Sequence, residues 1–156
     1  MSPPAPITLW RRLALYLLLF GLAGTAIELV LLGHYEDRWQ WTPLALLSLG
    51  LAAGIFVAFH PTRAPVSALR ALMALYLPAA AIGLYLHLRS NVEFELEMRP
   101  TMAGLELVRE SLTGAIPALA PGTMAQLGLL GLLVCFRHPA LSTARASSTD
   151  PHTEET

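Results

Sequence analysis

The sequence contains no lysine and little charge of either sign. Aspartate, glutamate and arginine together make up 13% of its 156 residues, about half the ~25% that soluble domains usually carry. The net charge is -1, so no basic surface of the kind that binds nucleic acid is predicted. The low charge instead predicts a chain whose solvent is largely lipid.

Features of enzymes are equally scarce. The single cysteine, Cys135, excludes an intrachain disulfide and a thiolate metal cluster, and its apolar surroundings favour a packing role. The sequence has no glycine-rich phosphate loop. Its loop hydroxyls, such as Ser111, have no adjacent histidine and acid. No catalytic residue is predicted, and the chain is more typical of a non-enzymatic protein.

Long apolar stretches dominate what is present. Each is close to the ~20 residues that a helix needs to cross a bilayer core ~30 Å thick. None alternates as a barrel strand would. The predicted fold is therefore all-α, an integral membrane bundle of four transmembrane helices within residues 13–141. The expected spans are 13–33, 41–59, 66–88 and 115–136.

The two ends of the chain carry different signals. Residues 1–12 form a short segment before the first span, and the polar residues 142–156 cannot bury enough surface to order themselves, which predicts a disordered tail. Arg11 and Arg12 before an apolar run also suit a cleaved signal peptide. Because that run continues through Leu32, a retained first helix is favoured.

The distribution of arginine predicts the orientation. One side of the membrane would hold six arginines: Arg11, Arg12, Arg63, Arg70, Arg137 and Arg145. The other would hold four: Arg38, Arg89, Arg99 and Arg109. The positive-inside tendency then places both termini in the cytoplasm. The short chain, which uses arginine and no lysine, suggests a bacterial plasma (inner) membrane.

The connection between the third and fourth spans is the largest segment outside the membrane. Residues 92–98 alternate between apolar and acidic side chains, which is typical of a strand or of the end of the third helix. Pro100 would begin a short amphipathic helix lying on the outer membrane surface, with its apolar stripe at Met102, Leu105, Val108 and Leu112. Residues 117–122 suit a re-entrant turn, a kinked helix start or, as the favoured alternative, a simple loop.

Glu28 is the most informative residue because it lies inside an apolar span. A charged carboxylate costs at least ~2.5 kcal/mol in hydrocarbon, so it should be neutral or paired. His87 and Asn91 share one face of the third helix with Gly83, and Gln126 lies in the fourth span. We therefore predict an outward-facing polar pocket of Glu28, His87, Asn91 and Gln126. The alternative is a set of hydrogen bonds that only fixes the helix register.

A metal site is a more specific form of this hypothesis. Its ligands would be His34, Glu36, His87, Glu93 and Glu95, a set that suits zinc, iron or manganese. The spacing matches no known metal motif, so pairing of the acids with nearby arginines is favoured. Haem is disfavoured, because the histidines lie at the ends of spans.

The leading functional prediction is an accessory or assembly component of the membrane. It would contact another membrane protein, or a second copy, through faces formed by Gly21 and Gly24 or by Gly128 and Gly131. One alternative is a membrane-embedded metal- or ligand-binding protein, with or without catalysis, that uses the Glu28 and His87 pocket. A further alternative is an oligomeric transporter with Glu28 as a proton relay.

Overall fold

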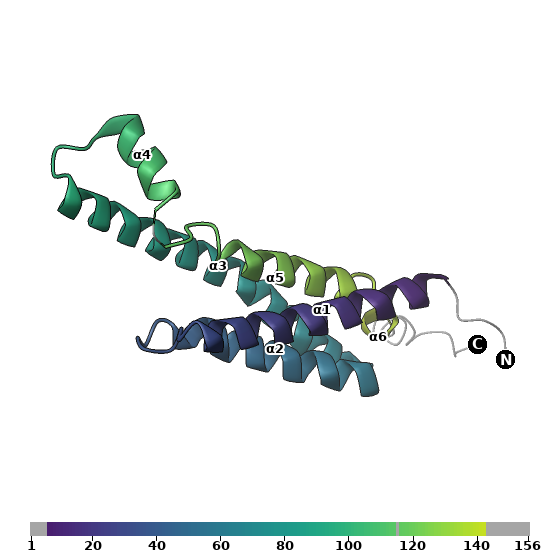
Figure 1. Ribbon diagram of the computed structural model, residues 1–156. Coiled ribbons are helices and arrows are strands. Elements are labelled where there is room, and N and C mark those ends of the chain that lie inside the picture. The colour runs from purple at the N-terminus through teal and green to yellow at the C-terminus, as the bar shows by residue number, and fades with distance from the viewer. Residues whose placement is uncertain (1–5, 115, 143–156) are drawn as a thin grey trace, which may run out of the picture. The chain divides into compact units, whose positions relative to one another are not determined.

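The computed structural model describes residues 6–114 and 116–142 (Figure 1). Every regular element in these residues is an α-helix, which confirms the all-α prediction. The helices are α1 (Pro6–Leu31), α2 (Trp41–Phe59), α3 (Arg63–Met98), α4 (Gly104–Leu112), α5 (Gly122–Cys135) and α6 (Pro139–Ser142). The start of the N-terminal segment, Arg145 and the predicted disordered tail from residue 143 onward lie outside the described residues.

Three helices are long and apolar enough to cross a membrane. They are α1 from Thr8 onward, α2 and α3, and the shorter apolar helix α5 accompanies them. This set fits the predicted helical membrane bundle. The bounds of α2 coincide with the predicted span 41–59, and its 19 residues extend over about 28 Å, close to the ~30 Å of a hydrocarbon core.

Helix α3 is longer than the predicted span 66–88. It has 36 residues, about 54 Å at 1.5 Å per residue. Residues 92–98 belong to this helix, so the strand alternative is wrong. Two ion pairs at four-residue spacing stabilise the extension: Arg89 to Glu93 at 2.7 Å and Arg99 to Glu95 at 3.3 Å. Pro100 follows, and the residue before a proline disfavours helix.

Helix α5 is shorter than the predicted span 115–136. Its 14 residues cover about 21 Å. The residues before it form turns, with hydrogen bonds from Ala120 N to Pro117 O at 3.1 Å and from Gly122 N to Leu119 O at 2.9 Å. Proline lacks the amide hydrogen that an earlier helix would need. The fourth crossing therefore stays a prediction, with α5 as its helical part.

Helix α4 is the predicted amphipathic helix between the third and fourth apolar helices. It begins at Gly104, not at Pro100, after an extended Ala103. Leu105, Val108 and Leu112 are exposed along one face, whereas Met102, which precedes the helix, is buried. The apolar stripe is thus confirmed without Met102.

The chain divides into two compact units, each described by itself. Unit 1 contains residues 1–73 and 130–156, and unit 2 contains residues 74–129. Both α3 and α5 pass from one unit to the other. The boundary between the units in α3 lies close to Pro78, a proline in the interior of the helix. Because proline has no amide hydrogen, the carbonyl of Ala74 lacks its usual helical partner.

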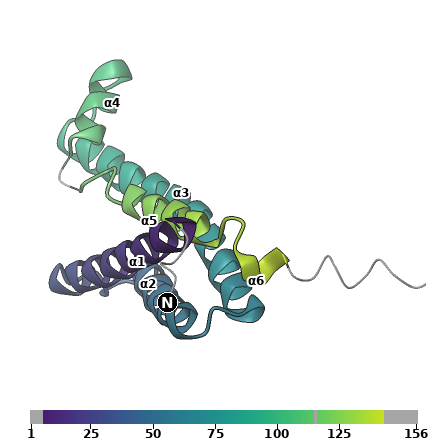
Figure 2. The ribbon, with the colours of Figure 1, turned by 90° about the vertical axis from the view of Figure 1, so that its right-hand side faces the viewer.

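Unit 1 is built on the hairpin of α1 and α2, which lie side by side (Figures 1 and 2). Leu18 and Leu22 of α1 and Leu47 of α2 are fully buried. Gly54 allows close packing here, because a Cβ at that position would lie 2.7 Å from the Cδ2 atom of Leu19. The start of α3 and the end of α5 complete this core with Val66, Leu69, Met73, Val134 and Cys135.

Candidate functional site

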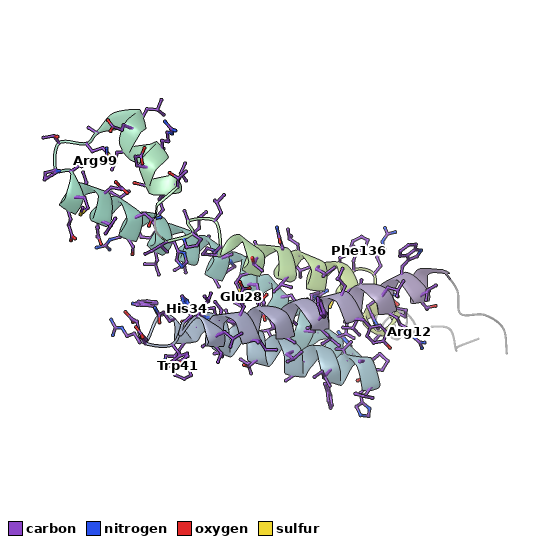
Figure 3. All side chains as sticks on the ribbon, viewed as in Figure 1. Arg12, Glu28, His34, Trp41, Arg99 and Phe136 are labelled. Atoms are coloured by element: carbon purple, nitrogen blue, oxygen red, sulfur yellow. The ribbon has the colours of Figure 1, made fainter. Side chains whose placement is uncertain are left out.

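The residues of the predicted polar pocket are divided between the two units. Glu28 belongs to unit 1, whereas His87, Asn91 and Gln126 belong to unit 2. Glu28 is an exposed residue of α1, toward the end that carries His34 (Figure 3). Gln126 is exposed on α5. A pocket that combines all four residues therefore stays a prediction.

Asn91 binds the end of α4 and the segment that follows it. Its side chain is buried, and its Nδ2 donates to the carbonyls of Ser111 at 2.9 Å and Ile116 at 2.7 Å. Its Oδ1 accepts a hydrogen bond from Ile116 N at 3.1 Å. Both amide hydrogens and the amide oxygen are thus used. Asn91 joins α3 to this part of the chain at two points.

His87 and Gly83 continue the same contact along α3. His87 Nδ1 lies 3.0 Å from the carbonyl oxygen of Pro117, so Nδ1 carries the hydrogen in this contact. At Gly83, a Cβ would lie 3.0 Å from the Cβ of Pro121. The face that four-residue spacing predicted for Gly83, His87 and Asn91 therefore packs against residues 111–114 and 116–121, and we call this contact the α3 clamp.

The partner of this face is the backbone, whereas polar side chains were predicted. Polar side chains inside an apolar span predict hydrogen bonds to polar side chains of other spans. A signal was present in Pro117 and Pro121, which lack backbone donors and interrupt helix formation. Carbonyl groups in such a segment need donors from elsewhere in the chain.

The candidate metal ligands are also divided between the units. His34 and Glu36 belong to unit 1, whereas Glu93 and Glu95 of unit 2 bind Arg89 and Arg99. Across the described part of the chain, no three histidine, cysteine, aspartate or glutamate side chains gather where they could hold a metal ion. The pairing of acids with arginine, the favoured alternative, is confirmed for Glu93 and Glu95.

The glycine faces differ in how much space lies in front of them. A Cβ at Gly131 would collide with Met73, so α5 uses this glycine to pack against α3 inside unit 1. Gly128 is buried. In contrast, no atom lies within 4 Å of a Cβ built on Gly24, which is exposed one helical turn before Glu28. The open small-residue face is therefore on α1.

A second polar site lies at the end of α5, where the sequence analysis singled out no ligand-binding residue. Arg11 of α1 donates to three carbonyls at this end: from Nε to Val134 at 3.2 Å and from Nη2 to Phe136 at 3.3 Å and Arg137 at 3.4 Å. A cavity beside them is lined by Arg70, Leu132, Cys135, Phe136, Arg137, His138, Leu141 and Ser142. We call it the arginine pocket.

His138 is the most buried polar residue of the arginine pocket. Its Nδ1 accepts a hydrogen bond from Ala140 N at 3.2 Å, so the neutral ring carries its hydrogen on Nε2. Burial lowers the pKa of His138 below its ordinary value of 6.5, and the positive charge of Arg11 lowers it further. His138 is therefore a neutral donor near pH 7.

Comparison of the sequence with models of protein families, with curated proteins and with solved structures finds no match.

Proposed function

We propose that the protein is a multi-pass component of a bacterial plasma membrane with both termini in the cytoplasm. Support comes from three helices of sufficient length and apolarity. Helix α5 and the turns from Pro117 onward would make a fourth crossing, because the apolar stretch that contains them approaches the ~30 Å of a hydrocarbon core. The arginine distribution of the sequence favours the orientation.

This topology can be tested by labelling single cysteines in intact cells, in a chain that carries Cys135→Ser. Thr62→Cys lies between α2 and α3, and Thr101→Cys between α3 and α4. A membrane-impermeant maleimide should label residue 101 in intact cells and residue 62 only after the cells are opened. The opposite pattern would reverse the orientation, and labelling of both in intact cells would contradict an odd number of crossings between them.

Within the membrane, the protein acts as a non-enzymatic accessory or assembly component that binds a second transmembrane helix. The partner is another membrane protein or a second copy of this chain. The observation that carries this proposal is the exposed pair of Gly24 and Glu28 on one face of α1. Exposed apolar side chains, including Phe20, Ile27 and Leu31, surround the pair.

Contact between the exposed Glu28 and lipid would be costly in free energy. A carboxylate facing lipid costs at least ~2.5 kcal/mol, and a polar group on a partner helix offsets that cost through a hydrogen bond. The close approach that such a bond requires is possible where the intervening residue is small. Gly24 supplies that space, since no other part of the described chain fills it.

The test is the assembly state of the full chain in lipid nanodiscs, measured by native mass spectrometry. The wild-type chain should be detected in a complex of fixed stoichiometry with a second copy of itself or with one other membrane protein. Gly24→Leu should abolish that association without unfolding the chain, because Gly24 is exposed, a Cβ there has no atom within 4 Å, and leucine favours helix over glycine by ~1 kcal/mol. Ala52→Leu, at an exposed residue of α2, is the matched control and should leave association unchanged.

Glu28 is tested separately in the same assay. Glu28→Gln keeps a hydrogen-bonding side chain and should retain most of the association, whereas Glu28→Leu should lose it. A wild-type chain that is monomeric and carries no other membrane protein would overturn the proposal. Association at the wild-type level in both Gly24→Leu and Glu28→Leu would also overturn the proposal.

A further inference from the structure

One end of unit 1 gathers positive charge, and none of the unit's described acidic residues lies in the segments that form this end. Arg11 and Arg12 of α1, Arg63 and Arg70 of α3, and Arg137 after α5 belong to the segments that meet there. The described acids of this unit are Glu28, Glu36 and Asp37. Figure 3 shows Arg12 and Phe136 at one end of the unit, and His34 and Trp41 at the other.

The separation between these charges is large. Arg11 and Glu28 are 17 residues apart on α1, or about 26 Å at 1.5 Å per residue. This is more than twice the ~10 Å Debye length at 0.1 M salt. The ion pairs found in residues 6–114 and 116–142 belong to Arg89 and Arg99 of unit 2. The arginine end of unit 1 therefore lacks an anion from the described chain.

The backbone around Arg137 is held in place. Arg137 has a φ of 45°, in the left-handed region that non-glycine residues avoid. Such a conformation persists where the surrounding structure fixes it. Here Arg11 binds the Arg137 carbonyl at 3.4 Å, and the Arg137 guanidinium lies 5.6 Å from the centre of the Phe136 ring. Arg11 thus positions Arg137 beside the arginine pocket.

The lining of the arginine pocket combines two kinds of surface. Arg70, Arg137 and His138 supply cationic and N–H donors, and guanidinium groups match the geometry of phosphate oxygens. Leu132, Phe136 and Leu141 form an apolar wall that joins the exposed side of α5. A free anion would need only the donors. A molecule with a phosphate head and an acyl chain would use both surfaces.

We propose that the arginine pocket binds the phosphate group of an anionic phospholipid, with an acyl chain lying along the end of α5. Basic pockets at the cytoplasmic ends of membrane helices commonly take such headgroups. The proposal does not depend on the Gly24 face of α1, and Gly24→Leu should leave lipid binding unchanged.

The test measures lipid retention by the full chain with native mass spectrometry and lipid protection by thermal unfolding. Wild type should retain phosphatidylglycerol in preference to phosphatidylcholine and should unfold at a higher temperature when phosphatidylglycerol is present. In Arg70→Gln/Arg137→Gln, binding should weaken about 25-fold. Each glutamine replaces a charge-assisted hydrogen bond to the phosphate with a neutral one, which should cost about fivefold in affinity. Arg70→Gln alone, at an exposed helical residue, should weaken binding about fivefold.

The matched control is Arg12→Gln/Arg63→Gln. It removes the same charge from the same end of unit 1, at exposed residues that do not line the pocket. The control should lose much less retention of phosphatidylglycerol than the pocket variant. Equal losses in the two variants would overturn the proposal, because they would indicate diffuse attraction to an anionic surface.

A lipid headgroup and free inorganic phosphate present the same phosphate oxygens, so a measurement with inorganic phosphate is needed to distinguish them. Millimolar phosphate added to protein in phosphatidylcholine should protect the protein from thermal unfolding far less than phosphatidylglycerol does. Equal protection by phosphate would overturn the lipid assignment and identify a site for a free anion. In phosphatidylcholine alone, the pocket variants must unfold at the same temperature as wild type. If the double variant unfolds at a lower temperature, the binding measured for Arg70→Gln decides the outcome.

Discussion

Asn91 and Ile116 exchange two hydrogen bonds, one in each direction. Asn91 Nδ2 donates to the Ile116 carbonyl at 2.7 Å, and the Ile116 amide donates to Asn91 Oδ1 at 3.1 Å. This reciprocal pairing resembles the way two backbones bind each other in a sheet. A side chain of α3 thereby satisfies the backbone of a segment that has no regular structure.

Asn91→Ala should destabilise the protein by about 2–4 kcal/mol. The substitution removes three hydrogen bonds and leaves the carbonyls of Ser111 and Ile116 without the donor that holds them. Asn91→Asp should cost nearly as much, because a carboxylate has no hydrogens for these carbonyls. Thermal unfolding in detergent measures both, with Ser90→Ala at the exposed neighbour as control. Wild-type stability in Asn91→Ala would contradict the clamp.

Gly114→Ala should destabilise the same region by about 1–3 kcal/mol. A Cβ at this position would lie 2.9 Å from Asn91 Cγ, and the hydrogen bonds of Asn91 prevent its side chain from moving aside. Gly122→Ala is the matched control, since no atom lies within 4 Å of its Cβ. The control should be neutral or stabilising by up to ~1 kcal/mol. Equal effects of the two substitutions would refute this explanation.

Ser111→Ala should be neutral or stabilising by about 1 kcal/mol. Within the described residues, the buried Ser111 hydroxyl has no hydrogen-bond partner, and an unsatisfied polar group costs free energy on burial. The Ser111 carbonyl, which Asn91 binds, is kept in the variant. Chemical unfolding in detergent would measure the difference. A clear loss of stability would show that the hydroxyl has a partner in solution.

Arg99→Met should loosen α4 without unfolding the protein. Arg99 pairs with Glu95 of α3 and with Glu106 of α4, the latter at 3.0 Å. Arg99 and Glu106 are exposed, whereas Glu95 is mostly shielded from solvent. Because the guanidinium itself is half exposed, the loss should be about 1 kcal/mol and should shrink at high salt. Hydrogen exchange over residues 104–112 should become faster. Arg109→Met, at an exposed residue of the same helix, is the control and should exchange like wild type.

Stability should depend on pH through His138. Because burial and Arg11 lower the pKa of His138 in the folded protein, the unfolded chain takes up its proton at a higher pH. The free energy of unfolding should therefore be highest above pH 6.5 and should fall as the pH drops from 6.5 through the folded value. His138→Asn keeps an acceptor for Ala140 N and should flatten this decline. An unchanged pH profile in the variant would assign the decline to other groups.

The apolar pattern predicted helices better than it predicted their ends. It placed α2 at its observed bounds, because the Trp41–Phe59 stretch begins and ends with the change from polar to apolar residues. The same rule ended the third span at Leu88, although α3 continues to Met98. Local ion pairs such as Arg89 with Glu93 stabilise the polar extension of α3, and hydrophobicity does not report these pairs.

The candidate site was less accessible to sequence reasoning. Four-residue spacing was sufficient to group His87 with Asn91, because helix geometry fixes which residues share a face. It could not identify their partners, since the carbonyls of Ser111, Ile116 and Pro117 look like any others in the sequence. The arginine pocket was equally hidden, because the contacts of Arg11 join residues more than 120 positions apart.

The α3 clamp has a consequence for the order of synthesis. Asn91 and Ile116 are 25 residues apart, so closing the segment between them costs little chain entropy. Their hydrogen bonds can form as soon as Ile116 has emerged from the ribosome, before α5 has emerged. A growing chain that folds from its N-terminus would thus fix the start of α5 before the rest of α5 can pack.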